Sequence, residues 1–408
     1  MVSRMFRLFI CLLLIFALSG CATPVETQPT QTEPEATLPL GAVTETDIAF
    51  LEQAYAGRTA AHGEMHDHAA TGGTSDGKQD LSTWISVMKE LDMDFATIVD
   101  HRQALHMELP EWDDTIFIGG SEPMAMPKDL NAATYNKLHF NMIFTDPQDL
   151  IRTVETYDQR YPGTGFNHFI DENGEWHFAY LYGKTGPTKA QMAELIQIIK
   201  DNNGMFVNVH PKSANYIVSE DPMDYWFADG TGLEVFYGYG GYAPSREVTL
   251  KNYKLWTDLL AAGKRIWATA GSDKHNMPNT DALTTVYTSE KKADAYLERF
   301  KVGDFVCGPV GIRMAIGEAT MGGATSFEGK RLVFGVGDFH SSAYDPTHTY
   351  RVDLMDDKGI VFSKVLDDPT QMTYFAVDAQ DVAFYRVVVY DTTTFYLHAL
   401  GNPIWNNR

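Results

Sequence analysis

Histidines and carboxylates are concentrated in residues 62–77, which read HGEMHDHAATGGTSDG. Side chains alternate along an extended strand, so His66 and His68 point to the same side. The glycine-rich turn that follows bends Asp76 back toward them. Two imidazoles and a carboxylate in this arrangement predict a metal-binding corner. A polar, histidine-rich surface loop is the alternative reading, but the density of potential ligands in one short segment favours the metal site.

Further candidate ligands lie at the ends of β-rich runs along the chain. They are His101 after residues 94–99, Glu122 after 115–121, His139 within 137–144, His210 after 205–209, and Asp273 and His275 after 266–272. Together with His66, His68 and Asp76, they offer only nitrogen and oxygen atoms, which suit Zn²⁺, Mn²⁺ or iron. The set is too large for one ion, so we expect two or three divalent metal ions. Glu122, a carboxylate among histidines, suits a bridging position.

The β-rich runs alternate with segments of helical periodicity. Expected helices cover 80–91, a segment that begins at Asp146 and Pro147, a segment from Thr188 to 202 that ends at Gly204, 246–262 and 291–300. Counting a sixth run at 233–237, which holds Glu234, seven β-runs are separated mostly by helices. This alternation is typical of parallel strands. In a closed βα-barrel the carboxyl ends of such strands share one rim, so the candidate ligands would meet there.

An aromatic segment interrupts this pattern between residues 161 and 186. Residues 165–178 read as a β-hairpin turned at Asn173 and Gly174. A hairpin inserted between two barrel units would form a lid or a pocket wall. Its His168 and His177 would line that pocket or face solvent.

The pattern changes from about residue 304 onward. Short β-runs separated by turn signals cover 312–316, 331–336, 349–354, 359–364, 372–377, 383–391 and 393–400. Their spacing predicts a small antiparallel β-sandwich over 304–408, after a barrel domain over 46–303. Cys307 lies near the start of the sandwich with no histidine next to it, and we expect it to be a small buried side chain.

The first residues resemble the signal segment of an exported lipoprotein. Arg4 and Arg7 precede a short apolar run, and Leu18-Ser19-Gly20-Cys21 is similar to a bacterial lipobox. We expect residues 1–20 to be a signal peptide and Cys21 to carry the lipid that attaches the protein to the membrane. Residues 21–45 have little to bury and would form a disordered tether. The expected location is extracytoplasmic, lipid-anchored to the bacterial membrane.

The chain is strongly acidic. Its 408 residues carry a formal net charge of −22. Broad contact with nucleic acid is not expected, because nothing would offset the repulsion from phosphates. An anionic substrate would need local positive charge, which bound metal ions supply.

The ligand blocks, taken in order, resemble those of the polymerase and histidinol phosphatase (PHP) superfamily. The matching blocks are HDH at 66–68 with SDG at 75–77, VDH at 99–101, GSE at 120–122, VHP at 209–211 and SDKH at 272–275. The resemblance implies a distorted seven-stranded βα-barrel with a two- or three-metal site made by the nine candidates above. His62 and Glu64 precede this motif, and would either orient ligands through hydrogen bonds or simply begin the strand. The C-terminal part is similar to the sandwich of a carbaryl-hydrolase-like branch.

The function implied is a metal-dependent phosphoesterase acting on a small phosphomonoester or phosphodiester through a metal-activated water. We take Arg102, Lys212 and Asp273 as its candidate catalytic residues. Arg102 and Lys212 would bind substrate oxygens, although surface salt bridges would explain these two side chains equally well. Two rival functions stay open: a hydrolase of carboxylic or carbamic esters that uses the same metals, and a non-catalytic lipoprotein that binds metal or ligand.

Overall fold

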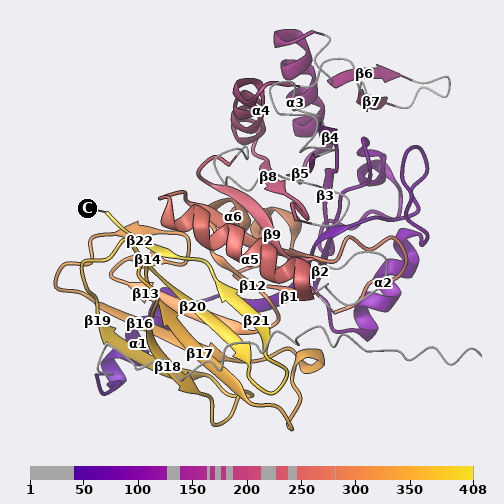
Figure 1. Ribbon diagram of the computed structural model, residues 1–408. Coiled ribbons are helices and arrows are strands. Elements are labelled where there is room, and N and C mark those ends of the chain that lie inside the picture. Colours follow the sequence, from indigo (N-terminus) through magenta and orange to yellow (C-terminus); the bar gives the residue numbers. More distant parts are fainter. Residues whose placement is uncertain are drawn as a thin grey trace, which may run out of the picture. The chain divides into compact units, whose positions relative to one another are not determined.

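The computed structural model describes residues 41–125, 138–162, 166–170, 176–180, 187–212, 227–237, 246–280 and 282–407. All of them belong to one compact unit, residues 36–408. The fold is mixed α/β and combines a large sheet with a smaller antiparallel sheet (Figure 1). The expected signal peptide, Cys21 and most of the expected tether lie outside the described residues. Among the described helices, none combines the length and apolar character that a membrane span requires.

Seven neighbouring strands of the large sheet supply the candidate ligands. In spatial order they are β10 (Ile266–Gly271), β9 (Thr231–Tyr237), β8 (Met205–Asn208), β5 (Leu138–Phe144), β3 (Phe117–Ser121), β2 (Phe95–Ile98) and β1 (Thr59–Asp67). β1, β2 and β3 pair in parallel, and so do β8, β9 and β10. β5 runs antiparallel to both β3 and β8. The carboxyl ends of six strands and the amino end of β5 therefore lie at one edge of the sheet.

The orientation of β5 corrects the expectation of parallel strands throughout. No helical pattern separates the third and fourth β-runs of the sequence, so no crossover helix was expected there. The short strand β4 (Met124–Ala125) follows β3 and pairs antiparallel with the first residues of β5. The chain thus returns along β3, whereas a parallel strand would need a crossover.

On the side away from β2, β1 has one neighbour along its first half and another along its second half. Its first half, Thr59 to Gly63, pairs antiparallel with β11 (Thr284–Thr288), a strand that we did not expect from the sequence. Further along, the N–H of Asp273 donates to the carbonyl of His66 at 2.9 Å, and the N–H of His68 donates to that of Lys274 at 2.8 Å. The end of β1 therefore lies beside the residues that follow β10.

Apart from α1, which the sequence did not predict, the helices begin close to where the sequence places them. They are α1 (Glu45–Ala54), α2 (Leu81–Glu90), α3 (Pro147–Arg160), α4 (Lys189–Asp201), α5 (Arg246–Ala261) and α6 (Ala293–Val302), with a short 3₁₀ helix at Leu105–Glu108. Asp146 and Thr188 cap α3 and α4 as predicted. The left-handed residue after α4 is Asn203, with φ of 65°, and not the expected Gly204. Gly204 instead allows close packing, because a Cβ there would lie 2.6 Å from Cζ of Phe144.

The predicted hairpin is present as β6 (Phe166–Ile170) and β7 (Trp176–Tyr180), which pair antiparallel. It packs against α3, and α3 packs against α4 (Figure 1). The turn at residues 171–175 and the side chains of His168 and His177 lie outside the described residues. The role of the hairpin as a lid stays a prediction.

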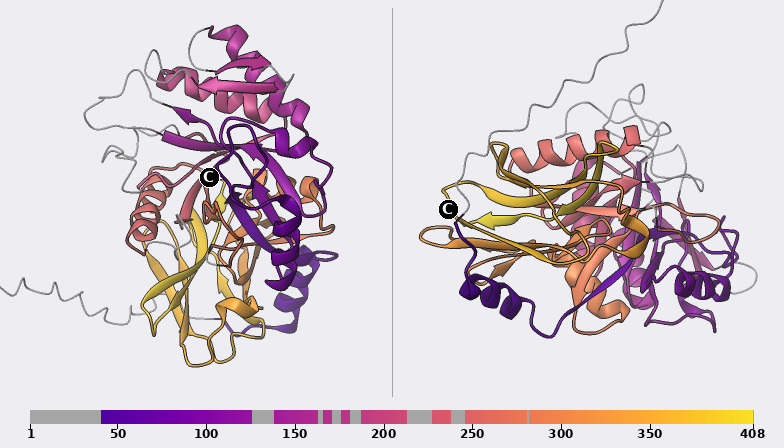
Figure 2. Two further views of the ribbon diagram at one scale, coloured as in Figure 1. Left: turned by 90° about the vertical axis from the view of Figure 1, so that its right-hand side faces the viewer. Right: turned by 90° about the horizontal axis from the view of Figure 1, so that it is seen from below.

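The C-terminal strands form two antiparallel layers. β12 (Phe305–Cys307), β21 (Tyr396–Gly401), β20 (Phe384–Asp391), β17 (Tyr350–Met355) and β18 (Ile360–Val365) continue the large sheet from β11. β14 (Ala319–Thr320), β13 (Gly311–Ile316), β16 (Arg331–Gly337) and β19 (Thr373–Asp378) make the smaller sheet. Two short strands, β15 (Ala324–Thr325) and β22 (Ile404–Asn406), pair with each other. The two layers lie against each other (Figure 2), and apolar side chains of both fill one core.

The C-terminal layers share a second core with α5 and β10. Trp256 of α5 and Ile266 of β10 are buried in the same cluster as Val388 and Leu400. Arg386 of β20 is buried there too, with its guanidinium 4.7 Å from the Trp256 ring centroid. Cys307 is buried in this cluster, as its sequence context indicated.

Candidate metal centre

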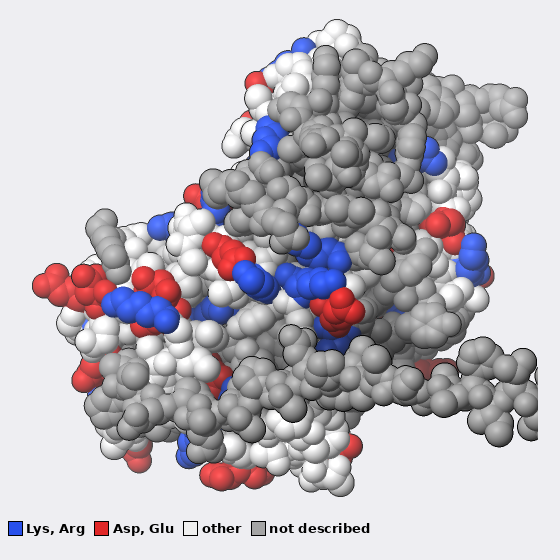
Figure 3. Space-filling view, viewed as in Figure 1, with Lys and Arg blue, Asp and Glu red and all other residues white. Residues whose placement is uncertain are grey.

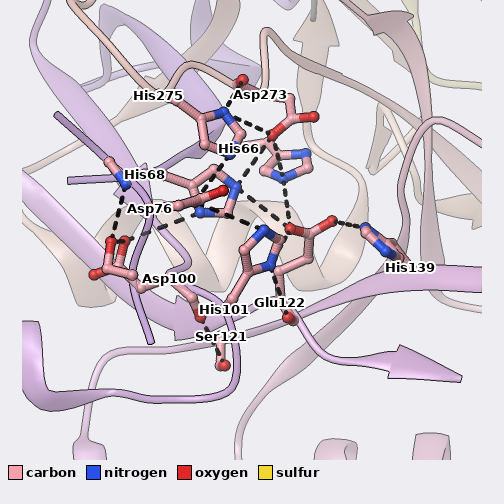
Figure 4. Close-up of polar contacts among 12 residues, drawn as sticks. His66, His68, Asp76, Asp100, His101, Ser121, Glu122, His139, Asp273 and His275 are labelled. Atoms are coloured by element: carbon pink, nitrogen blue, oxygen red, sulfur yellow. Dashed lines mark hydrogen bonds and ion pairs between the residues drawn. The ribbon is translucent and has the colours of Figure 1, made fainter. Parts of the chain in front are cut away.

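Nine side chains predicted as ligands meet at the strand edge described above (Figure 4). His66 and His68 come from the end of β1, His101 follows β2, Glu122 follows β3, His210 follows β8, and Asp273 and His275 follow β10. Asp76 comes from the loop after β1. His139 stands near the beginning of β5, and only the antiparallel direction of β5 brings it to this edge. The strand order therefore explains how residues far apart in the sequence become neighbours.

The central ligand group contains His66, His68, Glu122 and Asp273, and one donor atom of each lies within 4.8 Å of the others. His68 Nε2 lies 3.1 Å from Asp273 Oδ1 and 3.3 Å from Glu122 Oε2. Within the described part of the chain, these three atoms and His66 Nε2 are buried and have no hydrogen-bond partner. Buried lone pairs without donors are costly. A divalent cation would satisfy all four at once, so the donor set fits a metal ion.

The inner ligand group contains Glu122, His139 and His210, all of them buried. Glu122 Oε1 lies 2.7 Å from His139 Nδ1 and 3.2 Å from His210 Nε2. The other carboxylate oxygen, Oε2, faces the central group. Glu122 thus lies where a bridging carboxylate would lie.

The outer ligand group contains His68, Asp76, His101 and His275. Asp76 Oδ1 lies 3.1 Å from His275 Nε2 and 3.7 Å from His101 Nε2. The side chains of Asp76, His101 and His275 are 51%, 19% and 16% exposed, whereas those of the other two groups are almost fully buried. Among the described ligands, the outer group is therefore the part of the site that is most exposed to solvent.

Asp100 holds the loop that carries Asp76. Its carboxylate accepts from the N–H of Ala69 and from Oγ of Ser75, each at 3.0 Å, and also from Oγ1 of Thr71. His106, whose Nδ1 lies 3.2 Å from Asp100 Oδ2, keeps the pKa of the buried Asp100 carboxyl below its usual value together with His68 and Thr71, although burial opposes this shift. The loop folds back tightly, since a Cβ on Gly77 would lie 2.6 Å from the N of Ala69. Asp76 therefore reaches the histidines from a fixed loop.

The buried carboxylates of the site need positive charge near them. Burial lowers the pKa of His68, but the nearby carboxylates of Asp273 and Glu122 outweigh burial and raise this pKa to about 10. Burial raises the pKa of Glu122, but the neighbouring histidines, His139 first, hold it well below its usual value. Nearby carboxylates raise the pKa values of His66, His68 and His101 against the effect of burial, so protons on these three rings offset negative charge when no metal is bound. Divalent cations would take over that role.

Three residues in or beside the site have left-handed backbones. The φ angles of Arg102, His210 and Asp273 are 58°, 32° and 52°. Such values are unfavourable for residues other than glycine, and they are found mainly where the surrounding structure holds a functional group in place.

The two basic residues predicted to bind substrate lie next to ligands in the sequence. Arg102 is half-buried, and its Nε is buried without a hydrogen-bond partner among the described residues. Lys212 is half-buried as well, and its N–H donates to Oδ1 of Asn252 in α5 at 3.2 Å. Their contact with substrate stays a prediction.

Two buried acidic residues, Glu234 and Glu64, support the ligands. Glu234 of β9 accepts from His66 at 3.0 Å, and burial raises its pKa to about 7. Glu64 of β1 accepts from the N–H and the hydroxyl of Ser272, next to Asp273. Its pKa is raised to about 7 by burial, and burial beside Glu64 also raises the pKa of Asp67.

Glu234 and Asp100 were not among the predicted site residues. Glu234 stands in the middle of a strand, so the rule that ligands follow strand ends passes over it. The sequence does contain a signal for Glu234: it is an acidic residue between the apolar Leu233 and Val235, where a charge without a partner would be unstable. Of the two residues before the motif, Glu64 supports the site, whereas His62 Nδ1 lies 3.0 Å from Oγ1 of Thr285 and the His62 ring meets the His340 ring edge to face.

Comparisons with known proteins give structural likenesses only. No family model matches the chain, and no curated protein matches it. One similar solved structure is a two-domain protein from Bacteroides vulgatus that contains a predicted PHP-like metal-dependent phosphoesterase. The likeness covers 85% of this chain and 95% of that chain, at 13% identity and a TM-score of 0.38.

Two other solved structures cover less of the chain. An amidohydrolase from Chromobacterium violaceum is 15% identical, with a TM-score of 0.33, over 54% of this chain and 89% of that chain. The lesion-specific endonuclease Q from Pyrococcus furiosus is 15% identical, with a TM-score of 0.37, over 60% of this chain and 57% of that chain. Because these identities and TM-scores are low, the function proposed below rests on the side chains of this protein.

Proposed function

We propose that this protein is a metal-dependent phosphoesterase of the PHP type that hydrolyses a small phosphomonoester or phosphodiester. The observation that supports it most is the convergence of three ligand groups, which share His68 and Glu122, at one strand edge. Shared ligands suit two or three neighbouring divalent ions of Zn, Mn or Fe. The donor set contains no sulfur, which agrees with these metals.

The proposed fold is a distorted seven-stranded βα-barrel followed by a sandwich. Strands β1, β2, β3, β5, β8, β9 and β10 would form the barrel wall. The hydrogen bonds between the end of β1 and residues 273–274 support closure at the ligand edge. β11 occupies the other half of β1, so closure there is incomplete, and this is the distortion that we propose.

The proposed reaction assigns separate tasks to the residues of the site. Divalent cations, when bound, lower the pKa of water and offset the charge on ester oxygens. His66, His68, Glu122 and Asp273 would hold them through the lone pairs that have no hydrogen-bond donor among the described residues. Asp76, His101 and His275 leave the open side for the ester.

We further propose that Arg102 and Lys212 bind the non-bridging oxygens of the substrate. Arg102 follows the partly exposed ligand His101, and Lys212 follows His210-Pro211. Positive charge next to the outer group would draw a phosphate group to an otherwise acidic protein. Asp273 would serve as a metal ligand in contact with the reacting water.

A small substrate fits the surface better than a nucleic acid does. On the face that carries α5, basic and acidic side chains are interspersed, as in the pairs Lys251–Glu247 and Lys254–Asp258 (Figure 3). Among the described side chains of this face, the mixed pattern offers no continuous basic track along a phosphate backbone. The endonuclease likeness nevertheless makes a DNA oligonucleotide a necessary arm of the assay.

The proposed cellular setting follows from the first residues of the sequence. We propose an extracytoplasmic protein that is attached to the membrane through a lipid on Cys21, with residues 21–45 as its tether. The barrel would cover 46–303 and the sandwich 304–408. Metabolic labelling with a radioactive fatty acid, with Cys21→Ser as the control, tests this attachment.

The activity assay compares four substrates on protein loaded with Mn²⁺ or Zn²⁺. They are p-nitrophenyl phosphate, bis-p-nitrophenyl phosphate, p-nitrophenyl acetate and a DNA oligonucleotide. We expect turnover of a phosphate ester that disappears with chelation and in Asp273→Asn. Turnover of the acetate alone would replace this proposal with the carboxylic-ester rival, and bound metal without turnover of any ester would favour the non-catalytic one.

A further inference from the structure

The carboxylate of Glu234 connects two ligands of the site without belonging to any of the ligand groups. Its Oε1 lies 3.0 Å from His66 Nδ1, and its Oε2 accepts from the N–H of His210 at 2.7 Å. An ionised carboxylate only accepts, so a neutral His66 ring beside it carries its proton on Nδ1. The other ring nitrogen, Nε2, faces Glu122 and Asp273 at 3.7 and 3.5 Å, and in the neutral ring it carries the lone pair that a metal ion binds.

The backbone at Gly271 allows Glu234 and His66 to approach each other closely. Gly271 lies on β10 beside β9, and a Cβ there would lie 2.5 Å from Cβ of His66 and 2.7 Å from Oε1 of Glu234. His210, which anchors the other carboxylate oxygen, has a φ of 32°. Both Glu234 and His66 are about 1% exposed, so water does not compete for their hydrogen bond.

We propose that Glu234 is a positioning residue that fixes the tautomer and orientation of His66 for metal binding, with the His210 N–H and Gly271 holding Glu234 in place. This inference rests on the proposed metal site and extends it to a residue that binds no metal itself. Carboxylates behind ligating histidines typically change metal affinity by about 10- to 100-fold.

Replacing the carboxylate by its amide distinguishes positioning from packing. In Glu234→Gln, one end of the side chain accepts and the other donates. With the oxygen toward His66, the amide NH₂ would oppose the His210 N–H. With the oxygen toward His210, the NH₂ would donate to Nδ1 and move the proton of His66 to Nε2, which removes the lone pair that binds metal. Neither arrangement satisfies both neighbours, although the shape is kept.

The experiment measures Zn²⁺ affinity and stoichiometry by competition with a chromophoric chelator. Glu234→Gln should lose about 10- to 100-fold in affinity for one class of Zn²⁺ sites. Asp353→Asn is the matched control, because Asp353 is a fully buried carboxylate in β17 that is hydrogen-bonded to Ser363 at 2.6 Å, and it should bind Zn²⁺ as the wild type does. In a His66→Ala background, Glu234→Gln should have little further effect, since it acts through His66. An equal loss in both backgrounds would overturn the proposed role.

A second variant tests the same contact from β10. Gly271→Ala should weaken Zn²⁺ binding, because the new methyl group separates Glu234 from His66. Gly232→Ala is its control. The crowding there is comparable, with Thr269 Cγ2 and Val207 Cγ2 at 2.9 Å, but the three atoms nearest to its Cβ belong to Thr269, Val207 and Met205 and not to Glu234 or His66. Equal affinities in the two variants would contradict the inference.

A measurement on the wild-type protein covers the case in which the variants do not fold. NMR of ¹⁵N-histidine protein loaded with Zn²⁺ should show His66 with its proton on Nδ1, and a proton on Nε2 would overturn the inference. If the wild type binds neither Zn²⁺ nor Mn²⁺, the proposed function fails together with this role. If the wild type binds metal and Glu234→Gln binds it equally well, only the role of Glu234 fails.

Discussion

The two carboxylate oxygens of Glu122 face different histidines. Oε2 lies 2.9 Å from His101 Nδ1 and 3.3 Å from His68 Nε2, whereas Oε1 lies 2.7 Å from His139 Nδ1. No other predicted ligand spans the central and inner groups in this way among the described residues. The proposed site therefore depends on this one carboxylate more than on any single histidine.

Glu122→Gln should lower both metal content and turnover. The amide keeps the size of the side chain but loses the charge that two cations would share. We expect at least about a 100-fold fall in turnover and the loss of at least one bound ion per chain. Metal analysis after gel filtration and steady-state kinetics measure these effects, with Asp353→Asn as the control. Full metal content in Glu122→Gln would contradict a bridging role.

Metal binding near neutral pH should release protons. Without metal, contacts with the carboxylates raise the pKa of His68 to about 10 and that of His66 well above its usual value, against the effect of burial. A metal ion needs the neutral ring, so protons leave when it binds, and affinity rises with pH. Calorimetric titration with Zn²⁺ at pH 7.5 in two buffers of different ionisation enthalpy measures this release. Identical heats in both buffers would disprove it.

His62 should make the metal-free protein less stable in acid. Burial, followed by the nearby His340, lowers the pKa of His62 from 6.5 to about 4. The unfolded chain then binds more protons between these two values. The contribution of His62 is therefore complete above about pH 6.5 and is lost as the pH falls toward 4.

Urea unfolding of the wild type and His62→Gln measures this contribution. Between pH 7 and 4.5 we expect the free energy of unfolding to fall by roughly 1–3 kcal/mol more in the wild type. Equal losses in the two proteins would show that His62 titrates in the folded state as it does in the unfolded chain.

The candidate metal ligands were predictable from the sequence. The buried residues that hold these ligands in place through hydrogen bonds were not. His66, His68 and the residues after later strands form a pattern because ligand chemistry and strand ends coincide. Glu234 and Asp100 act through contacts with residues far away in the sequence, and no local spacing encodes such contacts. His62 lies next to the motif in the sequence, yet its side chain packs against Thr285 and His340 and contacts no candidate ligand that we describe.

At the scale of elements, local signals set the ends of helices. The hydroxyl of Thr188 accepts from the N–H of Gln191 at 3.2 Å, and the Gln191 side chain accepts in return from the N–H of Thr188 at 2.8 Å. This capping box satisfies N–H groups that α4 itself cannot satisfy. Such contacts act within a few residues, so the sequence reveals them.

Thr188→Ala should destabilise the protein without changing the metal site. Loss of the cap should lower the free energy of unfolding by about 1 kcal/mol. Thr188→Ser keeps the hydroxyl and should be close to the wild type. Urea unfolding and Zn²⁺ titration of both variants test this expectation, and a change in Zn²⁺ affinity in Thr188→Ala would contradict it.

The strand arrangement was only partly predictable for a related reason. Runs such as 205–209 and 266–271 became strands, because short β-branched and apolar segments favour a sheet. The direction of β5 depends on its pairing with β4, and the neighbours of β1 depend on β11. These pairings are decided by tertiary contacts, which periodicity does not contain.

At the scale of the whole molecule, the C-terminal strands support the part of the chain that carries the site. Trp256 and Ile266 share a core with Val388 and Leu400, and β12 joins the large sheet through β11. The domain boundary that we predicted at residue 303 rests on a change in sequence periodicity. Periodicity does not reveal that apolar side chains on the two sides of this boundary pack into one shared core.

A chain that ends at residue 303 should therefore fail to fold stably. The cut would expose the apolar side chains of α5 and β10 that now face β20 and β21. We expect aggregation, or the loss of a cooperative thermal transition, when residues 41–303 are produced alone. A fragment that melts like the full chain and binds Zn²⁺ would show that the barrel part is independent.

The most direct test of the account is anomalous diffraction from crystals grown with Zn²⁺ or Mn²⁺. We predict at least two anomalous peaks at the strand edge. One should lie about 2.0–2.2 Å from Nε2 of His66, Nε2 of His68 and the facing oxygens of Glu122 and Asp273. Crystals saturated with metal that show no anomalous peak at these side chains would contradict it.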